Sequence, residues 1–237
     1  MKINYNNFAQ DYEESRKIDS LVYSTISCLL NLSKGDNILD FGCGTGNYLK
    51  QFFLDYKINP YGIEPSINMY KIARKKLNLN CIEYRDHTFL PLMNKVFDKI
   101  YTIDVIHHIK QIDIFFNNLR LIAAPKTKFC ICTESSSQLK EKYWIKYFPE
   151  ILEIDLNRFH TIDTIVKTGI ETGWIHKKTV TIETKSIEPI SSEFMECVKR
   201  KTLSALLLIS EESYKQGFFA MKKDYESEIL IPQYEGY

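Results

Sequence analysis

Apolar positions along the chain recur at two spacings, one typical of helices and the other typical of short buried strands. Between residues 18 and 30 the spacing is helical, and the mostly apolar run 38–41 then leads into a cluster of glycines. Further strands are predicted at 61–64, 81–84, 97–103 and 128–132, with helical patterns between them. Strands that alternate with helices in this way predict an α/β fold, in which helices cover both faces of a doubly wound, mostly parallel sheet.

The regular alternation of strand and helix patterns ends at about residue 134. Helices are predicted at about 135–160, 161–172 and 190–222, and strands at 178–184 and 229–231. The first and last of these helical stretches are expected to be small helical cap insertions. We expect about seven strands in the sheet and an N-terminal lid helix over about 1–32. One domain should span 1–237, because no internal repeat or linker divides the chain.

The strongest chemical signal follows the strand predicted at 38–41. Asp40 precedes the segment Gly42-Cys43-Gly44-Thr45-Gly46, in which glycines occupy alternating positions. The strand delivers this loop to the carboxyl edge of the sheet, where open α/β sheets bind ligands. Glycines permit a sharp turn and a close approach of the backbone to a bound molecule, and the next helix points N–H groups at it. We therefore expect a ligand site here, with a purely structural glycine turn as the alternative.

The spacing of the glycines separates the possible ligands. A dinucleotide fingerprint reads G-x-G-x-x-G, and a phosphate-binding P-loop needs Gly-Lys-Ser/Thr. Neither fits the G-x-G-x-G pattern of this chain, which disfavours a nicotinamide-dependent oxidoreductase. With Asp40 and Thr45, the segment resembles the first motif of the class I S-adenosylmethionine (SAM)-dependent methyltransferases, and residues 36–134 resemble the core of that family. The resemblance implies a Rossmann-like fold with SAM as the cofactor.

Glu64 strengthens this interpretation. It ends the second predicted strand, just before Pro65, about 20 residues past the glycine loop, where a carboxylate can accept both ribose hydroxyls of a nucleoside. The family resemblance implies the same role, and an acid that merely caps the next helix is the alternative. We count both Glu64 and Pro65 among the candidate cofactor-binding residues.

Two further pairs of residues are assigned by the resemblance alone. Asp86 and His87 follow the third predicted strand, where related methyltransferases contact the adenine. A turn-forming aspartate is the alternative, and His87 departs from the small residue that the family often has. Ile103 and Asp104 end the fourth strand, which implies a position near the methionine end of the cofactor.

The residues that bind the methyl acceptor are harder to predict from the sequence. Methyl transfer depends largely on positioning the two reactants, and it needs a base only when the acceptor loses a proton. His107 and His108 are the candidate catalytic bases, since histidine titrates near neutral pH, and structural packing is the alternative. Tyr12 and Arg16 are candidate substrate-binding residues. They lie in a leading segment that resembles the family's cofactor lid, although a helix docked on the core is equally compatible.

The aromatic insertion supplies the remaining candidates. Tyr143 and Trp144 are predicted to bind substrate, and Arg158 with its aromatic neighbours could roof an apolar pocket. An aromatic helix that packs only in the core is the alternative. Cys130 and Cys132 would share one face of a strand, but small apolar core residues are the simpler interpretation, so we predict no metal site.

Composition narrows the choice of partner and compartment. Lys and Arg total 31 against 30 Asp and Glu, so the chain has no basic excess of the kind that nucleic-acid-binding proteins carry. The amino end lacks the apolar core of a signal peptide, and no apolar run approaches the length of a membrane span. The six cysteines are scattered rather than spaced as a disulfide framework. We expect a cytoplasmic protein with no membrane partner.

The sequence therefore predicts an enzyme that transfers a methyl group from SAM to an oxygen, nitrogen or carbon atom of a small molecule. A tRNA or protein methyltransferase and a catalytically silent SAM-binding regulatory or scaffold protein are the alternatives. The pattern specifies neither the acceptor nor the oligomeric state.

Overall fold

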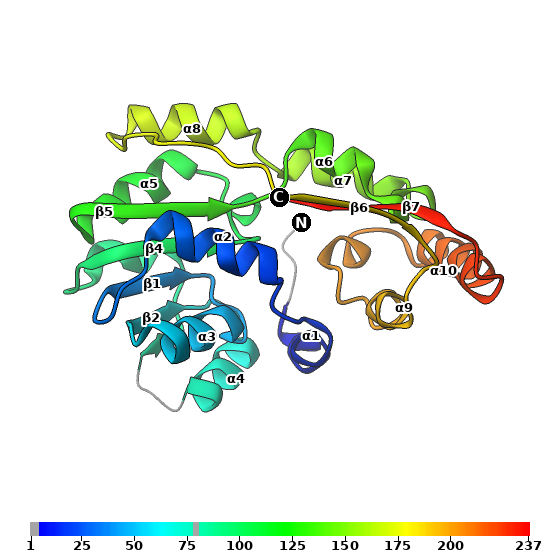
Figure 1. The fold of residues 1–237 in the computed structure, drawn as a ribbon, viewed down its shortest axis with the longest axis horizontal. Helices are drawn as coiled ribbons and strands as arrows, with labels where there is room; N and C mark the ends of the chain where they lie inside the picture. The colour runs from blue at the N-terminus through cyan, green and yellow to red at the C-terminus, as the bar shows by residue number, and fades with distance from the viewer. Residues whose placement is uncertain (1–4, 78–80) are drawn as a thin grey trace.

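The computed structural model describes residues 5–77 and 81–237 (Figure 1). In chain order its elements are η1 (Tyr5–Phe8), α1 (Ala9–Ser15), α2 (Ser20–Leu30), β1 (Asn37–Phe41), α3 (Asn47–Tyr56), β2 (Asn59–Ile63), α4 (Ile67–Leu77), β3 (Ile82–Glu83), η2 (His87–Leu92), β4 (Phe97–Ile103) and η3 (Ile106–His108). They continue with α5 (Ile112–Leu121), β5 (Ala123–Cys132), α6 (Ser136–Glu141), η4 (Tyr143–Lys146), α7 (Glu150–Arg158), α8 (Ile162–Glu171), β6 (Glu183–Glu188), α9 (Ser192–Lys199), η5 (Ser204–Leu207), α10 (Glu211–Glu226) and β7 (Ile231–Gly236).

The main sheet is parallel and has the strand order β3-β2-β1-β4-β5. β1 lies at its centre, where Leu39 is opposite Tyr61 of β2 and Ile100 of β4. The chain first adds strands on one side of β1 and then crosses to the other side. The strand order therefore reverses between β1 and β4, and open α/β sheets bind ligands outside the carboxyl ends of the strands at such a reversal.

Successive residues of β1 enter different cores, one on each face of the sheet. Ile38 packs with side chains of α2, α3 and α4, whereas Leu39 and Phe41 pack with side chains of η2, α5 and α8. The fold is therefore Rossmann-like, with helices on both faces of a parallel sheet, as predicted from the alternation of patterns.

The predicted number of about seven strands in this sheet was wrong, because the main sheet has five. β6 and β7 instead form a separate antiparallel ribbon, with Glu183 opposite Gly236 and Glu188 opposite Ile231. The β-branched residues at 178–182 had predicted a strand there, but β6 begins only at Glu183. All the side chains of β6 are exposed, so this strand lacks the buried face that would place it in the main sheet.

A helical cap lies beyond the carboxyl ends of the main strands (Figure 1). η4, α7, α9, η5 and α10 share a core of their own, in which Phe148, Ile151, Val198, Leu206 and Met221 are almost fully buried. The ribbon joins this core through Ile231 of β7. The stretches predicted as helical cap insertions, 135–160 and 190–222, hold η4, α7, α9, η5 and the start of α10, which extends beyond the second stretch to Glu226.

The leading segment is not one continuous lid helix. α1 ends at Ser15, Arg16 is extended with φ −94° and ψ 110°, and α2 begins after Asp19. The Asp19 carboxylate accepts hydrogen bonds from the N–H groups of Leu21 and Val22, which fixes the start of α2. α2 packs on the sheet as a core helix, so only η1 and α1 are positioned as a lid. Residues 1–4 of the predicted lid lie outside the described residues.

Within residues 5–77 and 81–237, no helix combines the length and the apolar character that crossing a membrane requires.

Candidate active site

The glycine loop after β1 is built from backbone conformations that favour glycine. Gly42, Gly44 and Gly46 have φ values of 77°, 54° and 79°. A Cβ at Gly42 would lie 2.4 Å from Cγ2 of Val105, so the loops that follow β1 and β4 touch at this point. A Cβ at Gly44 would meet no described atom within 4 Å. The backbone at Gly44 is therefore open to a ligand, while Cys43 and Thr45 are buried.

Glu64 directly follows β2 and is tied to the same loop. One carboxylate oxygen accepts a hydrogen bond from the Gly44 N–H at 2.9 Å, and the other accepts one from the Ser66 N–H at 2.7 Å. Burial raises the pKa of Glu64 to about 7, although both N–H donors act to lower it. A carboxylate oxygen can accept more than one hydrogen bond, so this carboxylate still has capacity for ligand hydroxyls. Pro65, next in the chain, is exposed.

Two more predicted acids lie around the loop. The Asp40 carboxylate accepts a hydrogen bond from the Tyr101 hydroxyl at 2.7 Å, and burial together with nearby Glu64 raises the pKa of Asp40 to about 7. Asp104 has a left-handed backbone with φ 56°, and its carboxylate accepts a hydrogen bond from the Tyr237 hydroxyl at 3.2 Å. Desolvation and the neighbouring Glu134 raise the pKa of Asp104 to about 6. The structure therefore gathers Asp40, Glu64 and Asp104 at one edge of the sheet.

The predicted adenine-contacting pair lies in a turn. The Asp86 carboxylate accepts hydrogen bonds from the N–H and the hydroxyl of Thr88, at 2.9 and 2.6 Å, and thereby caps η2. This is the turn-forming role that the sequence left as an alternative. His87, the first residue of η2, and Ile103, the last residue of β4, are half-buried. Contact of these three residues with a cofactor stays a prediction.

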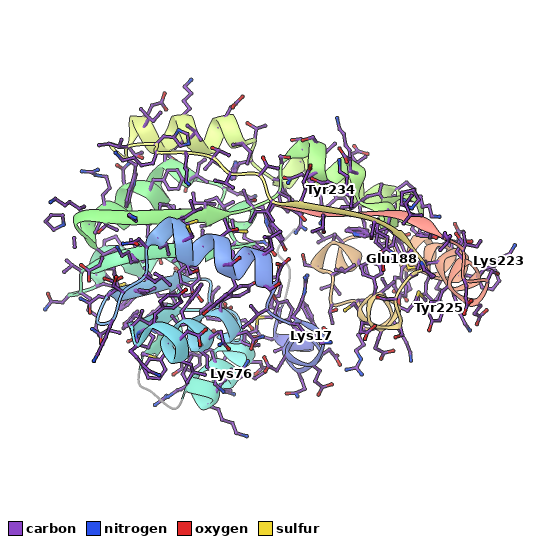
Figure 2. The ribbon with its side chains drawn as sticks, viewed as in Figure 1. Lys17, Lys76, Glu188, Lys223, Tyr225 and Tyr234 are labelled. Carbon is purple, nitrogen blue, oxygen red and sulfur yellow. The ribbon has the colours of Figure 1, made fainter. Side chains whose placement is uncertain are left out.

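The lid, formed by η1 and α1, contacts elements on both sides of the glycine loop. We call the region around His107 and His108 the acceptor side, because the candidate bases lie there. The Ser66 hydroxyl donates to the side-chain oxygen of Asn6 at 2.8 Å, and the Tyr5 hydroxyl lies 2.8 Å from Nε2 of His108. Lys76 of α4, labelled in Figure 2, pairs with Glu13 of α1 at 2.6 Å. These contacts hold η1 and α1 over the carboxyl ends of the main strands.

Tyr12 and Arg16 lie on the inner side of this lid. The Arg16 guanidinium carbon is 5.5 Å from the centre of the Tyr12 ring. Burial raises the pKa of Tyr12, and Asp104, Glu64 and Asp40 raise it further, which places Tyr12 within electrostatic reach of all three acids. Nε of Arg16 is buried without a hydrogen-bond partner among the described residues.

The two candidate bases differ in their surroundings. The His107 ring stacks on Phe159 at 4.1 Å between ring centres, and neither of its buried nitrogens has a hydrogen-bond partner in the described part of the chain. Burial strongly lowers the pKa of His107, and the positive charges of neighbouring groups lower it further. His108 is more exposed, and desolvation together with Arg158 lowers its pKa as well. Both histidines are therefore neutral near pH 7.

Tyr143 and Trp144 belong to the interior of the cap. Both are buried there, and the Tyr143 ring lies 5.1 Å from that of Phe194. Nζ of Lys142 lies 5.4 Å from the Trp144 ring. The structure thus supports the alternative of core packing for both residues.

The fold brings further side chains to the region around His107 and Asp104. Arg158 was predicted to roof a pocket, whereas Thr133, Glu134, Lys142 and Tyr237 were missed. Nη1 of Arg158 and Oγ1 of Thr133 are buried and have no hydrogen-bond partner among the described residues. Tyr237 reaches Asp104 from the end of the ribbon, and Lys142 pairs with Glu134. Strand-end position was an available signal for Thr133 and Glu134, which directly follow β5. Nothing local marked Tyr237.

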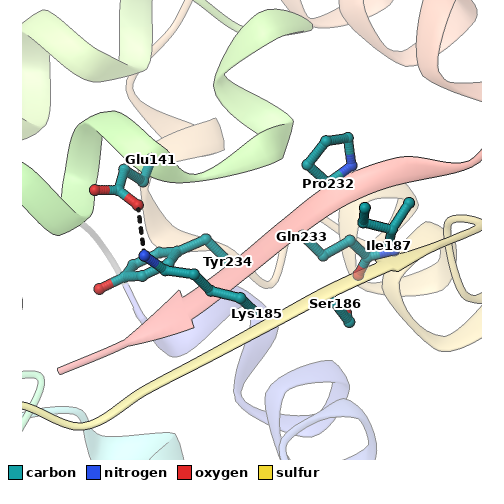
Figure 3. A pocket seen from close by; sticks show the side chains of 7 residues that line it. All are labelled: Glu141, Lys185, Ser186, Ile187, Pro232, Gln233 and Tyr234. Carbon is teal, nitrogen blue, oxygen red and sulfur yellow. Dashed lines mark ion pairs between the residues drawn. The ribbon is translucent and has the colours of Figure 1, made fainter.

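A shallow hollow on the ribbon is separate from this region (Figure 3). Lys185 of β6 and Glu141 of α6 form an ion pair across it at 3.7 Å. Its walls are formed by Glu141, Lys185, Ser186, Ile187, Pro232, Gln233 and Tyr234. None of these residues belongs to the glycine loop or to the groups around it, so we do not place the active site there.

Comparison with known proteins identifies the family. The family model described as a methyltransferase domain matches residues 12–167, about two thirds of the chain, so the chain belongs to the methyltransferase domain family. The prediction of a class I SAM-dependent methyltransferase is thereby confirmed at the level of the family, and with it the prediction of SAM as the family's cofactor.

Individual relatives agree with this assignment. An uncharacterised methyltransferase of Anoxybacillus flavithermus is 34% identical over 113 residues, which cover 44% of this chain and 52% of that protein. The chain thus spans about half the length of this curated relative. A protein assigned as a methyltransferase of an antibiotic biosynthesis pathway in Anabaena variabilis superimposes with a TM-score of 0.69 at 21% identity, covering 90% of this chain and 88% of that one. A SAM-dependent methyltransferase of Geobacter sulfurreducens, solved with S-adenosylhomocysteine, superimposes with a TM-score of 0.57 at 12% identity, covering 99% and 98%.

Proposed function

We propose that this protein binds SAM at the glycine loop and transfers its methyl group to a small-molecule acceptor. The observation that carries the proposal is the hydrogen bond from the Gly44 N–H to the Glu64 carboxylate, which joins the open glycine to a buried acid at the carboxyl edge of β1 and β2. Family membership supports the same cofactor.

The residues present are suited to holding SAM. Open space at Gly44 admits a ligand against the backbone, and Glu64 can accept hydrogen bonds from ribose hydroxyls. Arg16 has a buried Nε without a partner among the described residues, and a guanidinium is suited to a carboxylate such as that of a methionine moiety. Asp104 can accept a hydrogen bond from an ammonium group on the same side. We assign Asp86, His87 and Ile103 to the adenine and methionine ends by the family resemblance.

When bound, SAM supplies an electrophilic methyl group on a sulfonium. The chain's own contribution is to align the acceptor, exclude water beneath the lid and accept a proton where the acceptor must lose one. His107 is a weak base, because burial strongly lowers its pKa, so we assign it to binding. His108 is more exposed and contacts the Tyr5 hydroxyl, and it is the better candidate proton acceptor.

A small molecule is the favoured acceptor. The lid and the cap flank the region around His107 and His108, and an enclosed site of this kind suits a small ligand. The nearly balanced charge of the chain also lacks the basic excess that usually accompanies tRNA binding. The six cysteines are all unpaired, which supports a reducing compartment such as the cytoplasm.

The test is a methyl-transfer assay with isotopically labelled SAM. Purified protein is incubated with separate pools of metabolites, tRNA and protein, and the label is followed into each pool, with Glu64→Gln as the control variant. We expect label in a small molecule and a loss of at least tenfold in the control. Label confined to tRNA or protein would contradict the small-molecule acceptor, and SAM binding without transfer to any pool would favour a silent scaffold.

A further inference from the structure

We propose that the acceptor carries an oxyanion, either a carboxylate or a phosphate, and that Arg158 binds this group together with His107 and Thr133. The inference rests on the proposed function, because it names the chemical class of the acceptor. The three side chains come from the end of α7, from η3 and from the residue after β5.

Each of these side chains has buried polar atoms that lack a protein partner. They are Nη1 of Arg158, both ring nitrogens of His107 and Oγ1 of Thr133, judged against the residues that the structure describes. A buried polar group left unpaired costs about 1–3 kcal/mol. The three side chains share one region, because Thr133 and η3 follow the neighbouring strands β5 and β4, and His107 and Arg158 contact the same Phe159 ring. Several such atoms in one region are expected where a ligand completes the hydrogen bonding.

The protein holds the Arg158 guanidinium in a fixed orientation. Nε donates to the Asp155 carboxylate at 2.7 Å, and Nη2 donates to the Ser204 hydroxyl of η5 at 3.4 Å. Its central carbon lies 5.3 Å from the centre of the Phe159 ring, the same ring on which His107 stacks. Asp155 and Ser204 thus occupy two of the three nitrogens, and Nη1 remains to bind a ligand.

The unpaired atoms favour an anionic ligand over a cationic one. Arg158 can only donate, the Thr133 hydroxyl can donate, and neutral His107 presents one N–H donor beside one acceptor nitrogen, so donors predominate among the unpaired atoms. The nearby acids already have cationic partners, because Asp155 pairs with Arg158 and Glu134 pairs with Lys142. An oxyanion offers several acceptor directions to these donors, and hydrogen bonds between ionised groups are about twice as strong as neutral ones.

This group of donors lies on the acceptor side of the proposed cofactor site. The pKa of Tyr5 is raised to about 12, chiefly by burial, and both Arg158 and Asp104 influence it electrostatically. Contacts place the donors beneath the lid as well. The Tyr5 hydroxyl lies 2.8 Å from Nε2 of His108, and the His108 ring centre lies 4.1 Å from that of His107, which stacks on the Phe159 ring beside Arg158. An acceptor whose oxyanion binds at Arg158 would lie beneath the lid, between the cap and the strand ends.

The experiment is calorimetric titration of the full chain, saturated with S-adenosylhomocysteine, using sodium phosphate and sodium acetate at constant ionic strength. We expect one of these anions to bind and the Arg158→Gln variant to bind it at least tenfold more weakly. Arg158→Lys, which keeps the charge but loses the fork of donors, should fall between them. Arg120→Gln is the matched control, because Arg120 donates to the Gly173 carbonyl and lies outside the site; its anion affinity should be unchanged.

Failure of this inference and failure of the proposed function are distinguishable. If S-adenosylhomocysteine binds but neither anion does, or if Arg158→Gln binds the anion as well as the native chain, the oxyanion site is overturned and the proposed function stands. If S-adenosylhomocysteine itself does not bind the folded native chain, the proposed function fails first. Should Arg158→Gln not fold, the comparison of Arg158→Lys with Arg120→Gln decides the question.

Discussion

At the scale of single residues, backbone conformation and open space determine what the glycine loop tolerates. Gly44 and Gly35 have φ values of 54° and 86°, and a Cβ at either position would meet no described atom within 4 Å. Alanine at either position should therefore lower the free energy of unfolding by about 1–2 kcal/mol, the cost of a left-handed backbone. Only Gly44 borders the proposed cofactor, so Gly44→Ala should also weaken binding of S-adenosylhomocysteine at least tenfold. Thermal unfolding and calorimetry measure the two effects, and equal affinities for the two variants would count against the assignment.

The cofactor side of the site was predictable because its signals are local. Asp40, the glycine loop and Glu64 each follow directly from a strand pattern, and the parallel sheet brings such positions to one edge. The acceptor side was not predictable in the same way. Arg158 lies at the end of α7 in the cap, and Tyr237 follows β7. Only tertiary packing brings Tyr237 to Asp104 and Arg158 toward His107.

At the scale of secondary-structure elements, Gly217 and Gly169 allow a controlled comparison, because both lie inside helices but differ in the space around them. A Cβ at Gly217 of α10 would lie 2.3 Å from the Tyr147 carbonyl oxygen and 2.5 Å from the Phe148 ring, whereas a Cβ at Gly169 of α8 would approach the Phe116 ring at 3.7 Å. We expect Gly217→Ala to lower the free energy of unfolding by about 1–3 kcal/mol, because α10 must move away from its neighbours in the cap. Gly169→Ala should raise it by about 0.5–1 kcal/mol, because alanine favours the helix and has room there. Denaturant titration measures both changes, and the same sign for the two variants would contradict the close packing of α10.

The strands of the main sheet followed from the alternation of patterns, whereas the ribbon did not. β6 and β7 pair Glu183 with Gly236, far apart in the sequence, and neither strand carries the continuous apolar run of a central parallel strand. A β-branched run at 178–182 indicated a strand by composition alone, but such preferences depend on burial and cross-strand neighbours. The break at Arg16 was missed for a related reason, since apolar spacing continues across the Asp19 cap.

At the scale of the whole molecule, the lid connects the two cores. Arg200, which directly follows α9, pairs with Asp11 and Glu14 of α1, at 3.4 and 2.8 Å. Lys76 of α4 pairs with Glu13, which also belongs to α1. α1 thus contacts both the cap and the Rossmann-like core. A ligand held beneath α1 would therefore lie against a segment that both the cap and the Rossmann-like core help to position.

The central claim is that the glycine loop and Glu64 bind SAM, and calorimetric titration with S-adenosylhomocysteine tests it most directly. The native chain and Glu64→Gln are compared at pH 6 and at pH 8, with NADH as the control ligand. In the ligand-free protein the pKa of Glu64 is raised to about 7, and the ribose hydroxyls bind best to its ionised carboxylate. The affinity of the native chain for S-adenosylhomocysteine should therefore rise by up to about tenfold from pH 6 to pH 8. Glu64→Gln should bind S-adenosylhomocysteine at least tenfold more weakly at pH 8 and lose most of this pH dependence. The pKa of Asp40 is also raised to about 7, so Asp40 accounts for any pH dependence that the variant keeps. Absence of S-adenosylhomocysteine binding by the folded native chain, or equal binding of NADH, would contradict the assignment of the glycine loop and Glu64 to SAM.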